Sequence, residues 1–236
     1  MADLVAHIRA DATALAGAAA SAQDAKIVRY DGWTQLDLLV HTGSVHRRTL
    51  EVVRSRSRER MGRVFPPDER WDTVLPWFRE GAALMADVLE HTDPRTPVWG
   101  FGPEPCVGSW RIRMALETTV HRWDAQRAVG MPDPINPLLA ARGIEEFGML
   151  WASSIPPGGI DRDLGLRASD TGRTWVLAVV DGTVRLGPGD ADVATTGTAS
   201  DLYLWLFGRV PTASLAVAGQ VAAWDRAIRA VPDASR

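Results

Sequence analysis

Glu117 and His121 lie four residues apart in a segment whose apolar residues recur at helical spacing. At about 100° per residue, two positions four apart lie within roughly 40° of one another on a helix, so the carboxylate and the imidazole project side by side. His41 lies in an earlier helical segment and could close the set from a facing helix. Two histidines and one carboxylate commonly hold catalytic zinc and leave a fourth position for a water or a substrate atom. These three residues therefore make a candidate open metal site.

The spacing alone leaves simpler interpretations open. A single histidine on an apolar helix face is more often a hydrogen-bonded core residue, and a Glu–His pair four residues apart also occurs on helix surfaces. Leu116 and Val120 give Glu117 apolar neighbours. Because a carboxylate is rarely buried without a cation or a metal to offset its lost hydration, this context favours the metal site. Asp124 is predicted either to orient the second histidine or to pair with Arg127.

The composition is that of an ordinary globular protein. Its 236 residues are 46% hydrophobic and 23% charged, far from the low hydrophobicity and high charge of disordered chains. The net charge of −3 argues against binding to nucleic acid or to a membrane surface. No apolar run approaches the roughly 18 residues that span a bilayer, and the first residues lack a signal-peptide pattern. We therefore expect a cytoplasmic protein. A small-molecule substrate and a monomeric or homodimeric state are further expectations, which do not follow from the composition.

Cys106 is the only cysteine, which excludes an internal disulfide and any site built from several cysteines. It follows Pro103 and Pro105 in a loop, and no residue pattern around it marks an activated thiolate. Any thiol chemistry is therefore expected to use a thiol from outside the protein.

The elements that must position the candidate ligands are helices. Apolar spacing predicts helices over residues 2–22, 34–54 and 72–91, and another that begins at Ser109. Thr34, with Asp37 three residues later, is predicted to cap the helix that carries His41, and Ser109 the helix that carries the other two candidates. The prolines and glycines of residues 92–108 predict a long loop that folds over another part of the protein. Four such helices are typical of a bundle.

The sequence pattern changes after a further predicted helix over residues 136–152. Ile155–Gly159, with two prolines and two glycines, marks a predicted boundary between a helical domain (1–155) and a second domain (160–236). The second domain is predicted to hold a hairpin at 174–186, a strand at 192–196, a helix from Ser200 to about Gly208, a strand at 215–217 and a final helix at 224–231. This pattern predicts a helical domain followed by a small α+β domain.

Two segments resemble one known family. Glu117–Ala128, together with Trp33 before Leu38–His41, resembles the maleylpyruvate isomerase family of mycothiol-dependent enzymes, whose N-terminal domain is a DinB-like four-helix bundle. The later segment Thr196–Arg209 is similar to the C-terminal domain of that family, which resembles sterol-carrier proteins. The resemblance covers nearly the whole chain and implies a DinB-like bundle followed by a sterol-carrier-like α+β domain.

The resemblance also implies a metal site and a cosubstrate. In the family, the histidine of the second helix and the Glu-x-x-x-His pair bind a divalent metal, usually zinc, and these positions are His41, Glu117 and His121 here. Many relatives carry a histidine just before the glutamate, where this chain has Leu116, and this difference leaves the reaction open. Mycothiol, a low-molecular-weight thiol, is the implied cosubstrate.

Zinc held by two imidazoles and a carboxylate lowers the pKa of a bound thiol or water, which makes a nucleophile at neutral pH. A thiolate that adds to a double bond, allows rotation and leaves again would catalyse cis–trans isomerisation, whereas one that stays attached would complete a thiol transfer. Arg111, Arg113 and Arg209 are candidates to bind polar groups of the substrate, with Arg209 the predicted catalytic residue. A zinc-dependent hydrolase that uses water and a non-catalytic protein that binds a small ligand are the alternatives.

Overall fold

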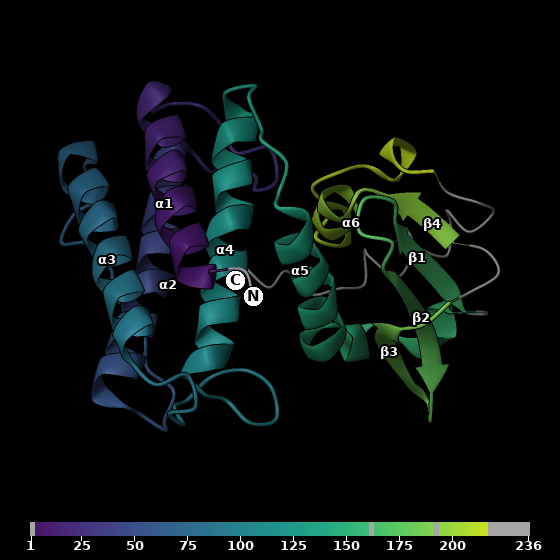
Figure 1. Ribbon diagram of the computed structural model, residues 1–236. Helices are drawn as coiled ribbons and strands as arrows, with labels where there is room; N and C mark the ends of the chain where they lie inside the picture. The colour runs from purple at the N-terminus through teal and green to yellow at the C-terminus, as the bar shows by residue number, and fades with distance from the viewer. Residues whose placement is uncertain (1–2, 161–162, 191–193, 217–236) are drawn as a thin grey trace. The chain divides into compact units, whose positions relative to one another are not determined.

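The computed structural model describes residues 3–160, 163–190 and 194–216. The chain divides into two compact units, Met1–Asp133 and Pro134–Arg236. The first unit is helical, and the second combines a small sheet with helices (Figure 1). The predicted succession of a helical part and an α+β part is confirmed.

The first unit is a bundle of four helices, coloured purple to teal in Figure 1. These helices are α1 (Leu4–Ser21), α2 (Gln35–Ser55), α3 (Trp71–His91) and α4 (Val107–Ala128). α1 packs against α3 and α4, and α2 packs against the same two helices. Fully buried side chains fill the space between them, among them Leu15 of α1, Leu38 of α2 and Phe78 of α3. The apolar spacing in the sequence thus identifies all four helices of the bundle.

α2 begins where the sequence predicts, after the capping residue Thr34. The Thr34 hydroxyl accepts a hydrogen bond from the backbone N–H of Asp37, and the Asp37 carboxylate accepts one from the backbone N–H of Thr34. Farther along α2, Gly43 leaves room for the Trp77 indole of α3, which a β-carbon at this position would overlap. The cap and this close approach fix the helix that carries His41.

The N-cap of α4 lies three residues earlier than predicted, at Cys106 instead of Ser109. The backbone N–H of Val107 donates to the carbonyl of Thr96, and Cys106 pairs with Pro97 in an isolated β-bridge, so the loop ends at this point. Cys106 is therefore the N-cap, without a side-chain hydrogen bond at the cap. The predicted cap, Ser109, lies inside the first turn.

The long loop before α4 folds against the bundle, as its prolines and glycines predict. The backbone N–H of Trp99 donates to the carbonyl of Ser57 at 2.6 Å, which ties the loop to the segment after α2. The indole N–H of Trp110, on α4, donates to the carbonyl of Trp99, also at 2.6 Å. These bonds hold the loop over one end of α2 and α4.

Over its described residues, which end at Ala216, the second unit has a four-stranded sheet and two α-helices that pack on it. Its elements are α5 (Pro137–Leu150), β1 (Leu164–Ala168), β2 (Thr174–Val180), β3 (Thr183–Pro188), β4 (Ala194–Gly197) and α6 (Ala199–Leu206), with short 3-10 turns at Ala152–Ser154, Pro157–Gly159 and Thr212–Ser214. The strand order is β3-β2-β1-β4, with β4 parallel to β1 and the other pairs antiparallel. β2 and β3 form the predicted hairpin, whose turn residues Asp181 and Gly182 both have positive φ, as this type of two-residue turn requires.

Three details of the second unit differ from the prediction. The expected boundary at Ile155–Gly159 falls inside this unit, which begins at Pro134 because α5 packs on α6 and β3. The sequence pattern misses β1, whose buried residues do not alternate with exposed ones. Thr198 caps α6 in place of Ser200, since the Ser200 hydroxyl accepts a hydrogen bond from the backbone N–H of Ile135 instead.

The last predicted elements are described only in part. The strand expected at 192–196 is β4 over the residues that are described, and Ala216 pairs with Thr196 in an isolated bridge. The predicted helix at 224–231 lies outside the described residues. Of the helices that are described, none has both the length and the apolar character needed to cross a membrane.

Candidate metal centre

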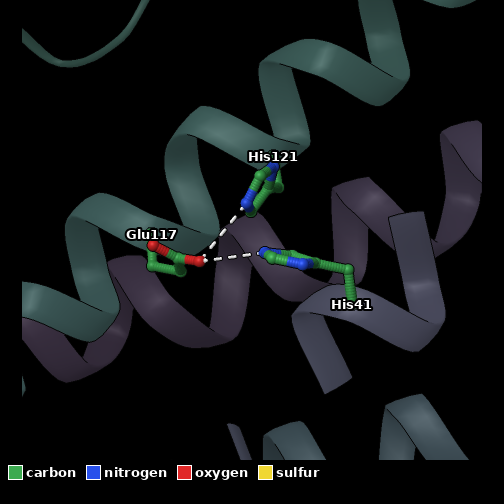
Figure 2. Close-up of side chains that lie close together, drawn as sticks. All are labelled: His41, Glu117 and His121. Carbon is green, nitrogen blue, oxygen red and sulfur yellow. Dashed lines mark ion pairs between the residues drawn. The ribbon is translucent and has the colours of Figure 1, made fainter. Parts of the chain in front are cut away.

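His41 projects from α2 toward α4, as Figure 2 shows. Its side chain is buried, with 5% of the residue exposed. The ring centre of Trp33, which precedes the helix, lies 5.2 Å from the imidazole centre. The capped helix and this aromatic neighbour hold the imidazole inside the bundle.

Glu117 and His121 come from successive turns of α4, the helix that packs against both α1 and α2. They are 9% and 3% exposed. They therefore do not form a Glu–His pair on the helix surface, which the spacing alone had left open. A buried carboxylate loses its hydration and needs compensating partners. The question is therefore which groups compensate it.

Three donor atoms converge at this point of the bundle. Oε1 of Glu117 lies 3.5 Å from Nε2 of His41 and 3.3 Å from Nε2 of His121, and one donor atom of each residue lies within 4.8 Å of the others. Ligands about 2.1 Å from a tetrahedral ion stand roughly 3.4 Å apart, close to both separations. Nε2 of His41 is buried and has no hydrogen-bond partner among the described residues. The cluster fits a divalent ion with three protein ligands.

Two further residues of α4 contact the atoms of His121 and Glu117 that do not face the cluster. Nδ1 of His121 lies 3.1 Å from Oδ2 of Asp124. Because an ionised carboxylate only accepts, the proton of the neutral ring lies on Nδ1 and the lone pair of Nε2 faces the cluster. Arg113 donates to Oε2 of Glu117, which leaves Oε1 for the two histidines. Asp124 therefore has the first of its two predicted roles, the orientation of the imidazole.

Burial and charge oppose one another at these groups. Burial alone would raise the pKa of Glu117, but the Arg113 guanidinium and the nearby imidazoles of His121 and His41 hold that pKa well below its usual value. Burial would lower the pKa of His121, and its hydrogen bonds to Asp124 and to the glutamate raise it instead. Burial prevails at His41 and lowers its pKa. Because a metal binds the unprotonated imidazole, acid competes with the metal more strongly at His121, whose pKa is raised, than at His41, whose pKa is lowered.

Arg63 lies beside the cluster, from the segment that follows α2. Its Nη1 is 3.4 Å from Nδ1 of His41. A guanidinium only donates, so Nδ1 accepts in this arrangement and the neutral ring carries its proton on Nε2. A ring that binds a metal through Nε2 carries its proton on Nδ1, and Arg63 then loses this acceptor.

The predicted ligands meet, whereas the two predicted arginines of the first unit, Arg111 and Arg113, bind different groups. Arg113 contacts the glutamate of the cluster, but Arg111 donates to backbone carbonyls at the end of α3. Arg209 lies in the second unit after α6, where its Nη1 donates to the carbonyl of Phe207 at 3.2 Å. Its catalytic role remains a prediction. Leu116 is fully buried, so an apolar side chain stands next to the glutamate.

Sequence reasoning missed two arginines near the cluster, Arg48 and Arg63. Arg48 is seven residues after His41 on α2, a helical spacing that could have identified it. Arg63 lies outside the helices, in a stretch with no periodicity, and only its contact with His41 shows that it belongs here.

The sequence model of one protein family matches the region that forms the bundle. That family is described as the mycothiol maleylpyruvate isomerase N-terminal domain, and the match covers residues 5–126, which include the three candidate ligands. A search of the curated proteins finds no match.

Two solved structures are similar to this one over most of the chain. One is the crystal structure of the mycothiol-dependent maleylpyruvate isomerase, with 13% sequence identity, 88% of each chain covered and a TM-score of 0.61. The other is a mutant of that isomerase in which alanine replaces a histidine, with the same identity and coverage and a TM-score of 0.62. At this identity the likeness shows a shared fold.

Proposed function

The chain belongs to the mycothiol maleylpyruvate isomerase family, and from this premise we propose that it is a metal-dependent enzyme with mycothiol as its thiol cosubstrate. The observation that carries the proposal is the cluster of His41, Glu117 and His121, which lies within the matched region. This cluster offers three donor atoms to one divalent ion, for which zinc is the first candidate. Three protein ligands leave a coordination position open for the sulfur of a thiol.

Side chains around the cluster fix the orientation and the charge of its donor groups. A divalent ion held there supplies a Lewis acid that lowers the pKa of a thiol placed beside it. Asp124 keeps Nε2 of His121 directed at the cluster, and Arg113 keeps the carboxylate of Glu117 ionised. The chain thus fixes both the orientation and the charge of its donors.

The reacting sulfur comes from outside the chain in this proposal. Cys106 is the N-cap of α4, eleven residues before Glu117, and a rise of 1.5 Å per residue puts these positions roughly 16 Å apart along the helix. Its Sγ lies 3.5 Å from the hydroxyl of Ser109, a residue of the same first turn. The protein's own thiol is therefore positioned to interact with the helix start and not with the cluster.

Two reactions would use such a thiolate. Addition to an activated double bond, rotation about the resulting single bond and elimination of the thiolate would isomerise a substrate from cis to trans. Attack on an electrophile with expulsion of a leaving group would transfer the thiol. Both need the same nucleophile, and Leu116 supplies no proton to either, so the substrate decides between them.

Arg209 is the catalytic residue that we propose for the second unit, on the resemblance of Thr196–Arg209 to the C-terminal domain of the family. Arg209→Met should lower kcat by at least about tenfold with the metal content unchanged, and Arg209→Lys should retain part of the rate. An unchanged kcat in Arg209→Met would remove this residue from the reaction.

Turnover with and without mycothiol tests the proposal. The zinc-loaded protein is assayed with maleylpyruvate for isomerisation and with a generic electrophile for thiol transfer. We expect at least one reaction to require mycothiol and to stop when the metal is chelated, with Glu117→Gln as the inactive control. Equal rates without the thiol would contradict the proposal and indicate hydrolysis by metal-activated water, and the absence of both reactions would point to a binding protein.

A further inference from the structure

A second group of charged side chains lies next to the three-donor cluster. Arg48 is seven residues after His41 on α2, and Arg113 is four residues before Glu117 on α4. Spacings of seven and four residues both return to the same face of a helix, so each arginine shares a face with a ligand. Arg48 packs on Trp110 of α4, so the two helices run antiparallel here and both arginines lie on the same side of the cluster.

Arg48 has aromatic neighbours but no acidic partner. Its Cζ lies 5.6 Å from the ring centre of Trp99 and 5.8 Å from that of Trp110. Its Nε is buried, and within residues 3–160, 163–190 and 194–216 it has no hydrogen-bond partner and its guanidinium forms no ion pair. With rings against the guanidinium, the N–H groups at its edge are what remains to bind a ligand.

Positive charge exceeds negative charge in this part of the bundle. Burial lowers the pKa of Arg48, and so do the charges of the neighbouring arginines, which are Arg63, Arg60 and Arg113. Glu117 raises that pKa, but this carboxylate already binds Arg113. A divalent ion in the cluster would add to the excess. Repulsion between like charges is unfavourable where they are partly shielded from water, as at Arg48 and Arg63, and an anion between these two side chains would offset this cost.

Arg63 becomes available when the cluster binds a metal. Its contact with Nδ1 of His41 requires that nitrogen to accept. Metal binding through Nε2 places the ring proton on Nδ1, so the guanidinium has to find another acceptor. An anion bound near Arg48 would provide one.

We propose that Arg48 and Arg63 are the side chains that bind a carboxylate group of the substrate beside the three-donor cluster. The planar N–H fork of an arginine matches the two oxygens of a carboxylate, and two such forks fix the direction of the rest of the molecule. This inference rests on the proposed function in one respect, because it places the reacting part of the substrate at the metal. It assigns to these arginines the selection of the substrate and its orientation.

Calorimetric titration of the zinc-loaded full chain with succinate tests the inference, with the neutral diamide succinamide as the matched ligand. We expect succinate to bind and succinamide not to bind. Arg48→Met should raise the Kd of succinate by about tenfold or more, since it removes a hydrogen bond to a charged group. Arg54→Met, which removes an exposed arginine from the same helix, should leave the Kd within about twofold.

Succinate binding to Arg48→Met with the wild-type Kd would overturn the inference, because the metal alone would then hold the carboxylate. No binding to the wild type, equal binding of succinamide, or binding of inorganic phosphate in place of succinate would also overturn it. If circular dichroism shows that Arg48→Met does not fold, Arg63→Met outside the helices carries the same expectation and the same contradicting result. Succinate binding that depends on Arg48, without turnover that depends on mycothiol, would contradict the proposed function alone. Turnover that depends on mycothiol, without succinate binding that depends on Arg48, would contradict this inference alone.

Discussion

Nδ1 of His121 lies 3.1 Å from Oδ2 of Asp124, one turn further along α4. Both side chains are buried, so water does not compete for this contact. The contact holds the proton of the neutral imidazole on Nδ1 and directs Nε2 at Glu117. The fold thus selects the nitrogen that can bind a metal.

Asp124→Asn is expected to weaken zinc binding by about tenfold or more, because the amide no longer fixes the charge and tautomer of His121. Competition with a chromogenic chelator measures the affinity. Asp133→Asn, which changes an exposed carboxylate that accepts from Gln126, is the control and should keep the wild-type affinity. Equal affinities in the two variants would remove Asp124 from the site.

The three ligands are expected to hold about one zinc ion per chain. His41→Ala, Glu117→Gln and His121→Ala should each lose most of it, as measured by elemental analysis of the folded proteins. His91→Ala, at the exposed end of α3, should keep full occupancy. Full occupancy in any of the first three variants would show that the ligand is a different residue.

Arg113→Met is expected to make zinc binding more sensitive to acid. Burial raises the pKa of Glu117 and Arg113 lowers it, so removal of the guanidinium moves the pKa upward. Protons then displace the metal at a higher pH, by about one unit or more. Titration of bound zinc against pH checks this. Arg113→Lys keeps the positive charge and should therefore keep the midpoint of zinc release close to that of the wild type. An unchanged midpoint would show that Arg113 does not set the charge of the carboxylate.

His46 is expected to make the metal-free protein less stable in acid. It is fully buried, with Nε2 2.9 Å from the hydroxyl of Thr118, and burial lowers its pKa to about 3. Between about pH 3 and 6.5 the unfolded chain binds a proton that the folded chain does not. The free energy of unfolding therefore does not depend on His46 protonation above about pH 6.5. Below that pH, proton uptake by His46 in the unfolded chain lowers the free energy of unfolding by ~1.4 kcal/mol per pH unit.

Urea unfolding between about pH 6 and 4 tests this dependence with the metal chelated. In His46→Gln the free energy of unfolding should fall less steeply with acid than in the wild type. Parallel slopes for the two proteins would mean that His46 takes up a proton in the folded state.

Cys106→Ser is expected to leave mycothiol-dependent turnover nearly unchanged, because the reacting sulfur belongs to the cosubstrate. Steady-state rates at saturating thiol measure this, and the zinc content should be unchanged as well. A loss of more than about tenfold in kcat would implicate the protein's own thiol.

The sequence predicts those parts of the candidate metal site that depend on local spacing. The spacing of Glu117 and His121 places both side chains on one face of α4, and the capping box at Thr34 fixes where α2 begins. That α2 faces α4 with His41 in register depends on tertiary packing, which spacing alone does not show. The resemblance to a family supplied that step.

The remaining differences arise where tertiary contacts decide the outcome. Apolar periodicity identifies α5 as a helix but does not show that it packs on α6 and β3, so the boundary is expected too late. Hydrogen bonds to the preceding loop start α4 at Val107 although Ser109 is the better capping residue by type. The charge of Arg63 acts on a residue far from it in sequence, and no local pattern shows this.

Cobalt substitution tests the central claim most directly, which is that the sulfur of mycothiol joins His41, Glu117 and His121 on one metal ion. Cobalt(II) replaces zinc in the full chain, and the absorption spectrum is recorded as mycothiol is added, with its S-methyl thioether as the control. We predict a sulfur-to-cobalt charge-transfer band that appears with mycothiol, is absent with the thioether and is lost in Glu117→Gln together with the metal. A cobalt-loaded protein whose spectrum does not change with saturating mycothiol would contradict the account.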